Sequence, residues 1–166
     1  MRLVEAVAEV DDVGAFVEQV GAIADEFAVT VQVFDARYVV SRRHLERAVE
    51  LADRAIDRGE NVARDRAVEI LCYAAGRRQI DQALTLGVDV GRTPVVVLVD
   101  AADEDADEAA AASALIDCLE SAETLGDYDE TLVREYFEIT ETELAATAGS
   151  LEDVVLERVA LLDVEK

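Results

Sequence analysis

Five consecutive residues, Gly76-Arg77-Arg78-Gln79-Ile80, combine side chains that could bind a nucleic acid. Two adjacent guanidinium groups can each donate paired hydrogen bonds to a phosphate. Gln79 could recognise a base edge, and Ile80 could pack on an unstacked base. The segment follows one helical pattern and opens another, so we expect outward-pointing backbone N–H groups that favour phosphate. The alternative interpretation is an ordinary turn between two helices that carries solvated arginines.

Other cationic and aromatic residues would extend this candidate surface if the neighbouring helices pack side by side. The cationic residues are Arg42, Arg43 and Arg64. Tyr38 and Tyr73 are potential base-stacking residues. Tyr73, however, lies in a helical pattern that is apolar on almost all sides, and this position favours the core.

The positive charge of this acidic chain is concentrated in one third of its length. Eleven of the fifteen basic residues, all of them arginine, lie between Arg37 and Arg92 among nine acids, which gives this stretch a net charge of +2. The remainder holds 29 acids and four bases and carries −25, so the whole chain carries −23. A cationic third in so acidic a protein indicates an anionic partner, and RNA phosphate fits. Arginine–glutamate pairing on a solvated helix is the alternative explanation.

Residues typical of enzymes and metal sites form no recognisable motif in the chain. It has no Gly-rich phosphate loop followed by Lys and Ser or Thr, no nucleophile elbow and no paired metal ligands. His44, the only histidine, flanks an apolar helical face, which favours a packed or capping imidazole over a general base. Cys72 and Cys118 both fall in apolar helical patterns, so we expect them in the core. We therefore expect a non-enzymatic protein with no metal and no cofactor.

The hydrophobic patterns that position these residues predict one α/β domain over residues 1–166, with a helical C-terminal third. Strands are expected over Leu3–Val10, Val29–Phe34 and Val95–Val99, the last opened by Pro94 and covered on both faces. Helices are expected over Val13–Phe27, between Ser41 and Gly59, and over Asp65–Ala75, Arg78–Leu86 and Glu108–Ala122, with capping boxes at Thr140 and Ser150. The helix after Ser41 should bury Leu45, Ala48, Val49, Ala52, Ala55 and Ile56. The sheet should be small, mixed or antiparallel, and covered by helices.

Acidity combined with avoidance of lysine, which appears only as Lys166, is typical of proteins from salt-saturated cytoplasms, so we expect a halophilic archaeal source. Above 1 M salt the Debye length falls to about 3 Å. RNA would then be held by contact hydrogen bonds and base stacking. The chain opens with strand-like residues instead of a signal peptide, and it has no apolar run near the ~20 residues that cross a bilayer. We therefore expect a cytoplasmic protein without membrane contact.

Four segments carry a family resemblance: Val33–Arg37, Ser41–Ala52, Glu69–Ile80 and Val155–Leu162. They resemble the archaeal KEOPS subunit that is homologous to the eukaryotic p53-related protein kinase-binding protein. The resemblance covers nearly the whole chain, and the Glu-Ile-Leu…Gly-Arg-Arg-Gln-Ile block is its most specific part. It implies a non-catalytic subunit of the complex that makes threonylcarbamoyl-adenosine in tRNA.

The resemblance implies two direct partners, with the rest of the KEOPS complex reached indirectly. One is the kinase-like ATPase subunit of the complex, and the other is tRNA, bound by its single-stranded 3′ CCA end. It implies that Arg77–Ile80, with Arg64 and Arg42 or Arg43, helps to hold that end. For the ATPase subunit we favour the C-terminal helices, where the candidates, each of which could equally be a core residue, are Leu151, Val155, Val159 and Leu162.

Two other classes of function remain compatible with the sequence. One is a kinase-binding scaffold that never touches RNA, in which the arginines would be silent in every RNA assay. The other is a small α/β enzyme with an unrecognised carboxylate site, against which the missing motifs argue.

Overall fold

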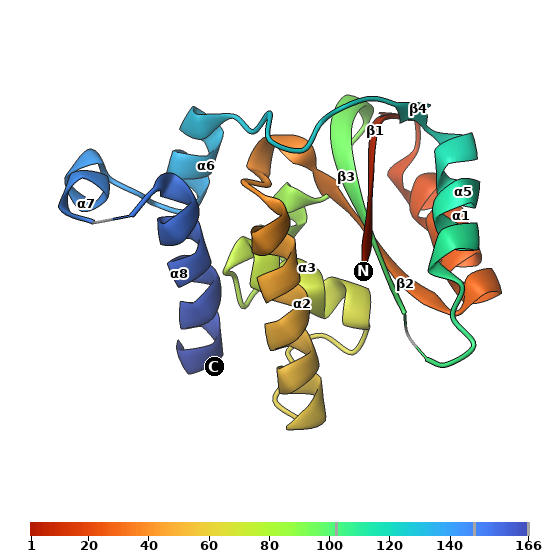
Figure 1. Ribbon diagram of the computed structural model, residues 1–166, viewed down its shortest axis with the longest axis horizontal. Helices are drawn as coiled ribbons and strands as arrows, with labels where there is room; N and C mark the ends of the chain where they lie inside the picture. Colours follow the sequence, from red (N-terminus) through yellow and green to blue (C-terminus); the bar gives the residue numbers. More distant parts are fainter. Residues whose placement is uncertain (102, 148, 166) are drawn as a thin grey trace.

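The fold is a four-stranded antiparallel sheet with helices on both faces (Figure 1), seen in a computed structural model that describes residues 1–101, 103–147 and 149–165. The strands are β1 (Arg2–Val10), β2 (Val29–Asp35), β3 (Gly91–Ala101) and β4 (Glu120–Ser121). Their order across the sheet is β2-β3-β1-β4, and every neighbouring pair is antiparallel. The expected α/β class with a small helix-covered sheet is confirmed.

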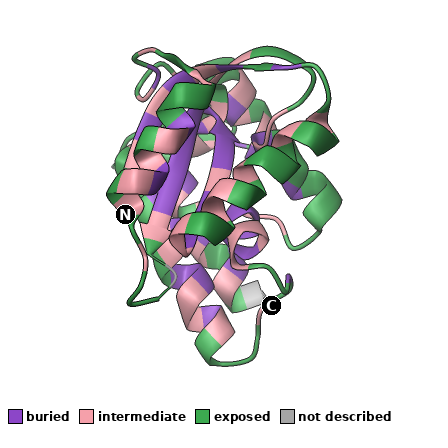
Figure 2. Cartoon of the chain, turned by 90° about the vertical axis from the view of Figure 1, so that its right-hand side faces the viewer, coloured by how far each residue is buried: buried purple, intermediate pink, exposed green. Residues whose placement is uncertain are grey.

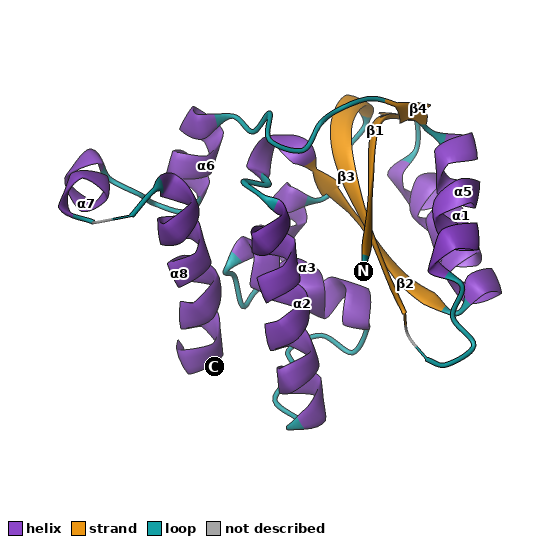
Figure 3. Ribbon diagram, in the orientation of Figure 1, coloured by secondary structure: helices purple, strands orange, loops and turns teal. Residues whose placement is uncertain are grey.

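The helices form layers on either side of this sheet. They are α1 (Val13–Phe27), α2 (Arg42–Asp57), α3 (Arg66–Ala75), α4 (Ile80–Ala83), α5 (Glu108–Cys118), α6 (Glu130–Tyr136), α7 (Glu141–Ala146) and α8 (Leu151–Glu165), with short 3₁₀ turns η1 (Ala36–Tyr38) and η2 (Leu84–Leu86). Figure 3 shows α1 and α5 on one side of the sheet, α2 and α3 on the other, and α8 beyond them. Among the described residues, no helix is long and apolar enough to cross a membrane.

The hydrophobic core lies on both faces of the sheet, because β3 is apolar throughout. Val95, Val97 and Val99 pack with the α1–α5 layer, whereas Val96 and Leu98 pack with α2, α3 and α8, and all five are fully buried. Figure 2 shows buried strands behind helices whose outer faces are exposed. The prediction of a central strand covered on both faces is therefore confirmed.

The strand β3 is longer than expected, and Pro94 lies inside it. Pairing between β2 and β3 ends at Asp35 and Val95, so Pro94 has only Val7 of β1 as its neighbour across the sheet. A proline is tolerated at such a position because the missing N–H would have no second strand to bond.

The predicted helix ends are confirmed where a side chain or a glycine closes the helix. Ser41 Oγ accepts a hydrogen bond from His44 N at 3.2 Å, and Gly59 adopts the left-handed region that ends α2. Thr140 Oγ1 caps α7 by accepting from Glu143 N at 3.0 Å. At the start of α8, Ser150 N donates to the Asp153 carboxylate at 2.9 Å, which is one half of the predicted capping box.

The helix predicted over Glu108–Ala122 ends four residues early, because strand β1 takes up the chain that follows. Ala122 N donates to Glu5 O at 3.4 Å, and the Glu5 carboxylate accepts the N–H groups of Thr124 and Leu125. These long-range bonds leave Glu120 and Ser121 as the short strand β4. A helical propensity was overridden here by tertiary hydrogen bonds.

Three expectations about buried positions were wrong. Cys72 is buried as expected, but Cys118 is exposed at the end of α5, where its sulfur accepts from Gln19 Nε2 at 3.2 Å. On α2, Val49 and Ile56 are half-buried, and Leu51 fills the core instead. His44 is the packed imidazole that the sequence favoured, since it is fully buried between two backbone partners.

Candidate nucleic-acid interface

The candidate segment begins where α3 ends, at Gly76. Gly76 has φ +61°, and its backbone N–H donates to Tyr73 O while the N–H of Arg77 donates to Cys72 O, both at 3.0 Å. These bonds satisfy the last carbonyls of α3. Because the Arg77 N–H is used in one of these bonds, it cannot bind a phosphate. The expectation of an outward-pointing N–H at this position is therefore wrong.

The side chain of Arg77 is half-buried and packs against α6. Its guanidinium donates to Tyr136 O, lies 4.6 Å from the centroid of the Tyr136 ring, and reaches Gln82 Oε1 at 3.4 Å. The Tyr136 hydroxyl donates to Gln82 O at 2.8 Å, and burial raises the pKa of Tyr136 to about 12. Arg77 therefore ties the end of α3 to α6, and its main contacts are structural.

Replacing Arg77 with Ala should lower the free energy of unfolding by about 1–2 kcal/mol, because a charged hydrogen bond and a cation–π contact are lost together. Urea unfolding would measure this loss. Arg47→Ala is the matched control, since Arg47 only pairs with Glu50 at the surface and its removal should change stability by less than about 0.5 kcal/mol. Equal losses in the two variants would contradict the structural role of Arg77.

The next three side chains, Arg78, Gln79 and Ile80, are all exposed, and Ile80 retains 40 % of its accessible surface. The helical segment expected from Arg78 to Leu86 begins two residues late: α4 starts at Ile80, has four residues and continues as the 3₁₀ turn η2 to Leu86. So short a helix has little macrodipole. Attraction for an anion in this segment therefore rests on the guanidinium groups.

The aromatic candidates are not available as a stacking pair. Tyr73 is fully buried and its hydroxyl donates to Asp163 at 3.0 Å, as its apolar pattern indicated. Tyr38 is half-buried, with its ring edge-on to Tyr136 at a centroid distance of 5.7 Å.

The start of α2 lies beside the end of α3, because His44 Nε2 bonds to Ala74 O at 2.8 Å. This brings Arg42 and Arg43 to the same end of the helix pair as Gly76. Both arginines are exposed, but each meets an acid: Arg42 pairs with Glu46 at 2.9 Å, and Arg43 pairs with Glu152 at 2.8 Å. Such exposed pairs are weak, so an anionic ligand could displace them.

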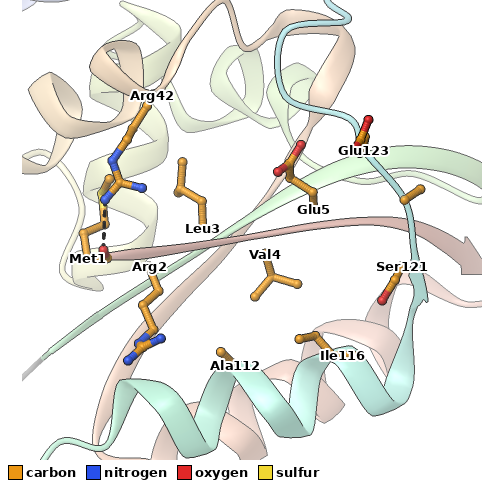
Figure 4. Close-up of a pocket in the computed structure, with 11 residues that line it drawn as sticks. Met1, Arg2, Leu3, Val4, Glu5, Arg42, Ala112, Ile116, Ser121 and Glu123 are labelled. Atoms are coloured by element: carbon orange, nitrogen blue, oxygen red, sulfur yellow. Dashed lines mark hydrogen bonds between the residues drawn. The ribbon is translucent and has the colours of Figure 1, made fainter.

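Arg42 also borders an open cavity of about 740 Å³ on the outer side of β1 (Figure 4). Its guanidinium donates to Met1 O at 3.1 Å, and Arg2 lies on the opposite side of the strand. Arg42 is therefore directed toward β1.

Arg64 is not brought together with the other candidates. It precedes α3, whereas Arg78 follows it, and the ten residues of α3 span about 15 Å. The segment before α3 is fixed by Glu69, a fully buried carboxylate that accepts the N–H groups of Val62 and Ala63 at 3.0 Å.

A protein-family model described as "Kinase binding protein CGI-121" matches residues 7–163. The chain belongs to the CGI-121 family. The family description supports a kinase-binding role and points to a non-catalytic protein. No curated protein matches the chain. Within the described residues, no group of three His, Cys, Asp or Glu side chains is placed to hold a metal ion.

In this CGI-121 family member, the four expected kinase-contact residues lie in its own core. Leu151, Val155, Val159 and Leu162 are between 0 % and 7 % exposed and pack against the cluster that includes α2 and α3. Their spacing along α8 marks the face that covers the domain, so a partner could reach them only if α8 detached. The exposed side of α8 instead carries Leu161 and Val164, which are 38 % and 79 % exposed.

Two residues that position the site were not predicted from the sequence. Glu69 anchors the segment that carries Arg64, and Arg158 on α8 donates to Phe137 O, Glu138 O and the Glu143 carboxylate. The signal for Glu69 was present, because a carboxylate within an apolar helical run must find hydrogen-bond partners. The sequence places the stem of Arg158 on the apolar face of the last helix, but its partners, two backbone carbonyls and the Glu143 carboxylate, are fixed only by the fold.

Proposed function

We propose that this protein is the KEOPS subunit that binds the kinase-like ATPase subunit and recruits tRNA through its 3′ CCA end. The family match supports the kinase-binding part. The observation that carries the RNA part is the exposed run Arg78-Gln79-Ile80, presented by a turn that Gly76 and Arg77 fix. The acidic composition supports the further proposal of a cytoplasmic, haloarchaeal setting.

In this proposal the three exposed residues contact the single-stranded end directly. Arg78 binds phosphate bidentately, Gln79 bonds to a base edge, and Ile80 packs on a base face. Arg77 acts as a positioning residue, because its guanidinium is already engaged with Tyr136. Arg42 and Arg43 add positive potential at the same end of the helix pair, as the contact between His44 and Ala74 places them there.

Arg64 would meet a different part of the tRNA, since the length of α3 separates it from Arg78. Stacking of the tail contributes roughly 1–3 kcal/mol per base, which alone gives weak binding. Contacts made by the rest of the complex then add through effective concentration, because the second contact is intramolecular. Recruitment by the tail would thus place the anticodon loop at the modifying subunit.

The ATPase subunit would contact the exposed side of the C-terminal helices, where Leu161 and Val164 are accessible. A scaffold that binds this subunit without RNA is the second candidate. The pairing of Arg42 with Glu46 and of Arg43 with Glu152 favours it, because paired arginines are typical of a solvated surface.

Arg78→Glu should weaken binding of intact tRNA at least tenfold, because loss of a charged hydrogen bond costs about 1.5–3 kcal/mol and the new carboxylate repels phosphate. Binding would be measured at low salt and in multimolar KCl, with intact tRNA and with tRNA lacking its CCA end. Arg92→Glu is the control, since Arg92 is 55 % exposed on β3 and pairs with Glu120. Association with the ATPase subunit should persist in both variants.

Each outcome of this experiment assigns a different role. Equal binding by the two variants would contradict the site at Arg78, and equal binding of the truncated tRNA would contradict recognition of the tail. If the unmodified protein binds neither tRNA but retains the ATPase subunit, the protein is a scaffold.

A further inference from the structure

The strand β2 leaves one edge of the sheet without a partner among the described strands. β2 pairs with β3 from Val29 to Asp35 in an unbroken register, and it is the last strand in the order β2-β3-β1-β4. Natural proteins usually protect such an edge with lysine, proline or a bulge. The sequence Val-Thr-Val-Gln-Val-Phe-Asp has none of these. The Gln32 side-chain amide donates to Val33 O at 3.0 Å, and a strand that pairs with this carbonyl would displace that bond.

A groove of about 490 Å³ runs beside this edge. Its floor is the strand from Val29 to Val33, one wall is α1, and the other wall is formed by α3, η2 and the residues that follow. The walls present apolar side chains to the groove, and Val17 of α1 and Leu84 of η2 are each 56 % exposed. Helix α1 contains no fully buried residue. An added strand would cover apolar surface on both of its faces.

The negative charge of the groove indicates what kind of segment could bind in it. Among the described residues that line it, the ionisable ones are Asp25 of α1 and Asp65, which caps α3, and both are acidic. An RNA backbone would be repelled by these carboxylates. A second copy of this chain would bring the same two acids and another net charge of −23. Both acids lie near the Val29 end of β2, because Asp25 is in the last turn of α1 and Arg66, next to Asp65, bonds to Thr30 Oγ1 at 2.9 Å. A segment with basic residues at the end that meets Val29 complements both carboxylates.

We propose that the edge of β2 receives an extended segment of a partner protein, apolar on both faces and basic at the end that meets Val29, as an additional strand. Backbone hydrogen bonds to β2 would supply affinity, and side chains that alternate toward α1 and toward η2 would supply specificity. The inference goes beyond the proposed tRNA and kinase functions and depends on neither. The residues of this groove differ from the run Arg78-Gln79-Ile80 that we propose for RNA binding.

Three synthetic peptides test this strand addition. The first is Lys-Lys-Val-Val-Thr-Val-Val-Lys-Lys, the second carries Glu in place of every Lys, and the third is the first peptide with alternate backbone amides methylated. The first peptide should shift the NMR signals of β2 amides and slow their hydrogen exchange. The second should bind at least tenfold more weakly through charge repulsion, and the third should lose a similar factor through its missing N–H donors.

Variants of the protein locate the binding site. Val17→Asp and Leu84→Asp, on opposite walls, should each weaken binding of the first peptide about tenfold. Val90→Asp is the matched control, because Val90 is 64 % exposed but does not line the groove, and it should bind as the unmodified protein does. All three substitutions are at exposed positions, so folding should be retained.

The proposal is overturned if millimolar concentrations of the first peptide leave the β2 amides unchanged. Equal binding of the methylated peptide would exclude backbone pairing, and equal loss in the Val90→Asp variant would exclude the groove. A homodimer whose β2 amides are already protected in the free protein would show that a second copy occupies the edge, which also overturns it.

Discussion

Lowering the pH from 7 to 4 should remove about 3 kcal/mol of folding free energy through His44 alone. The imidazole is fully buried, and burial lowers its pKa from 6.5 to about 4, although its bond to Ala74 O and the charge of Glu152 act in the opposite direction. The neutral ring suits its surroundings, since Nε2–H donates to Ala74 O at 2.8 Å and Nδ1 accepts from Val40 N at 3.4 Å.

The sign follows from the two pKa values. Between about pH 4 and pH 6.5 the unfolded chain binds a proton at His44 that the folded chain does not, so protonation favours unfolding. The contribution of His44 is therefore complete above pH 6.5 and is lost as the pH falls toward the pKa of the folded state.

The matched measurement compares the protein with a His44→Gln variant by urea unfolding at pH 7 and pH 4. Both contain the same carboxylates, so the difference between their pH dependences isolates the imidazole. The variant should be less stable at pH 7, because the backbone partners of His44 are disturbed, but it should lose about 3 kcal/mol less on acidification. Parallel pH profiles would contradict a buried neutral imidazole.

The elements that could be predicted from the sequence are those fixed by local signals. Ser41 marks a helix start because its hydroxyl accepts an N–H two or three residues ahead, and Gly76 marks a helix end because it adopts a positive φ without strain. The apolar run at Val95–Val99 indicated a strand covered on both faces, because no polar face remained for solvent.

The features that escaped prediction depend on contacts between distant residues. The Ala-rich helix α5 stops at Cys118 because Glu5 bonds the chain beyond it. Arg77 and Arg78 are identical in sequence terms, yet Arg77 contacts Tyr136 and Arg78 is exposed. No periodicity distinguishes these two arginines, because the partner of Arg77 lies 59 residues away.

In the candidate site, too, local signals were predicted from the sequence and long-range contacts were not. Sequence reasoning found the exposed run Arg78-Gln79-Ile80, but it grouped Arg64 with it although α3 keeps the two apart. It also selected Leu151 and Val155 of α8 for a partner, because an apolar stripe has the same spacing whether it covers the core or a second protein.

Gly76→Ala should lower the free energy of unfolding by about 2–4 kcal/mol, whereas Gly59→Ala should lower it by about 1–2 kcal/mol. Both glycines end a helix with positive φ, so alanine suffers the same left-handed strain at each, about 1–2 kcal/mol. A Cβ at Gly59 meets no atom within 4 Å, but a Cβ at Gly76 lies 3.2 Å from Arg158 O. That carbonyl belongs to the backbone of α8, so relieving the contact requires a shift of the helix.

Urea unfolding measures the difference in stability between the two variants. This difference shows how much α8 contributes to holding the turn that presents Arg78, Gln79 and Ile80. If the Gly76→Ala variant loses more stability and the hydrogen exchange of its α8 amides becomes faster, while Gly59→Ala leaves α8 unchanged, then the close approach of Gly76 to Arg158 explains the larger loss. Equal losses in the two variants, with the exchange of α8 amides unchanged, would mean that the contact between Gly76 and Arg158 costs no stability and that Arg77 alone fixes the turn. Arg158 also donates to Phe137 O, next to Tyr136, which accepts a bond from Arg77. The first result would therefore show that α8, the turn at Gly76 and the contact between Arg77 and Tyr136 form one packed unit.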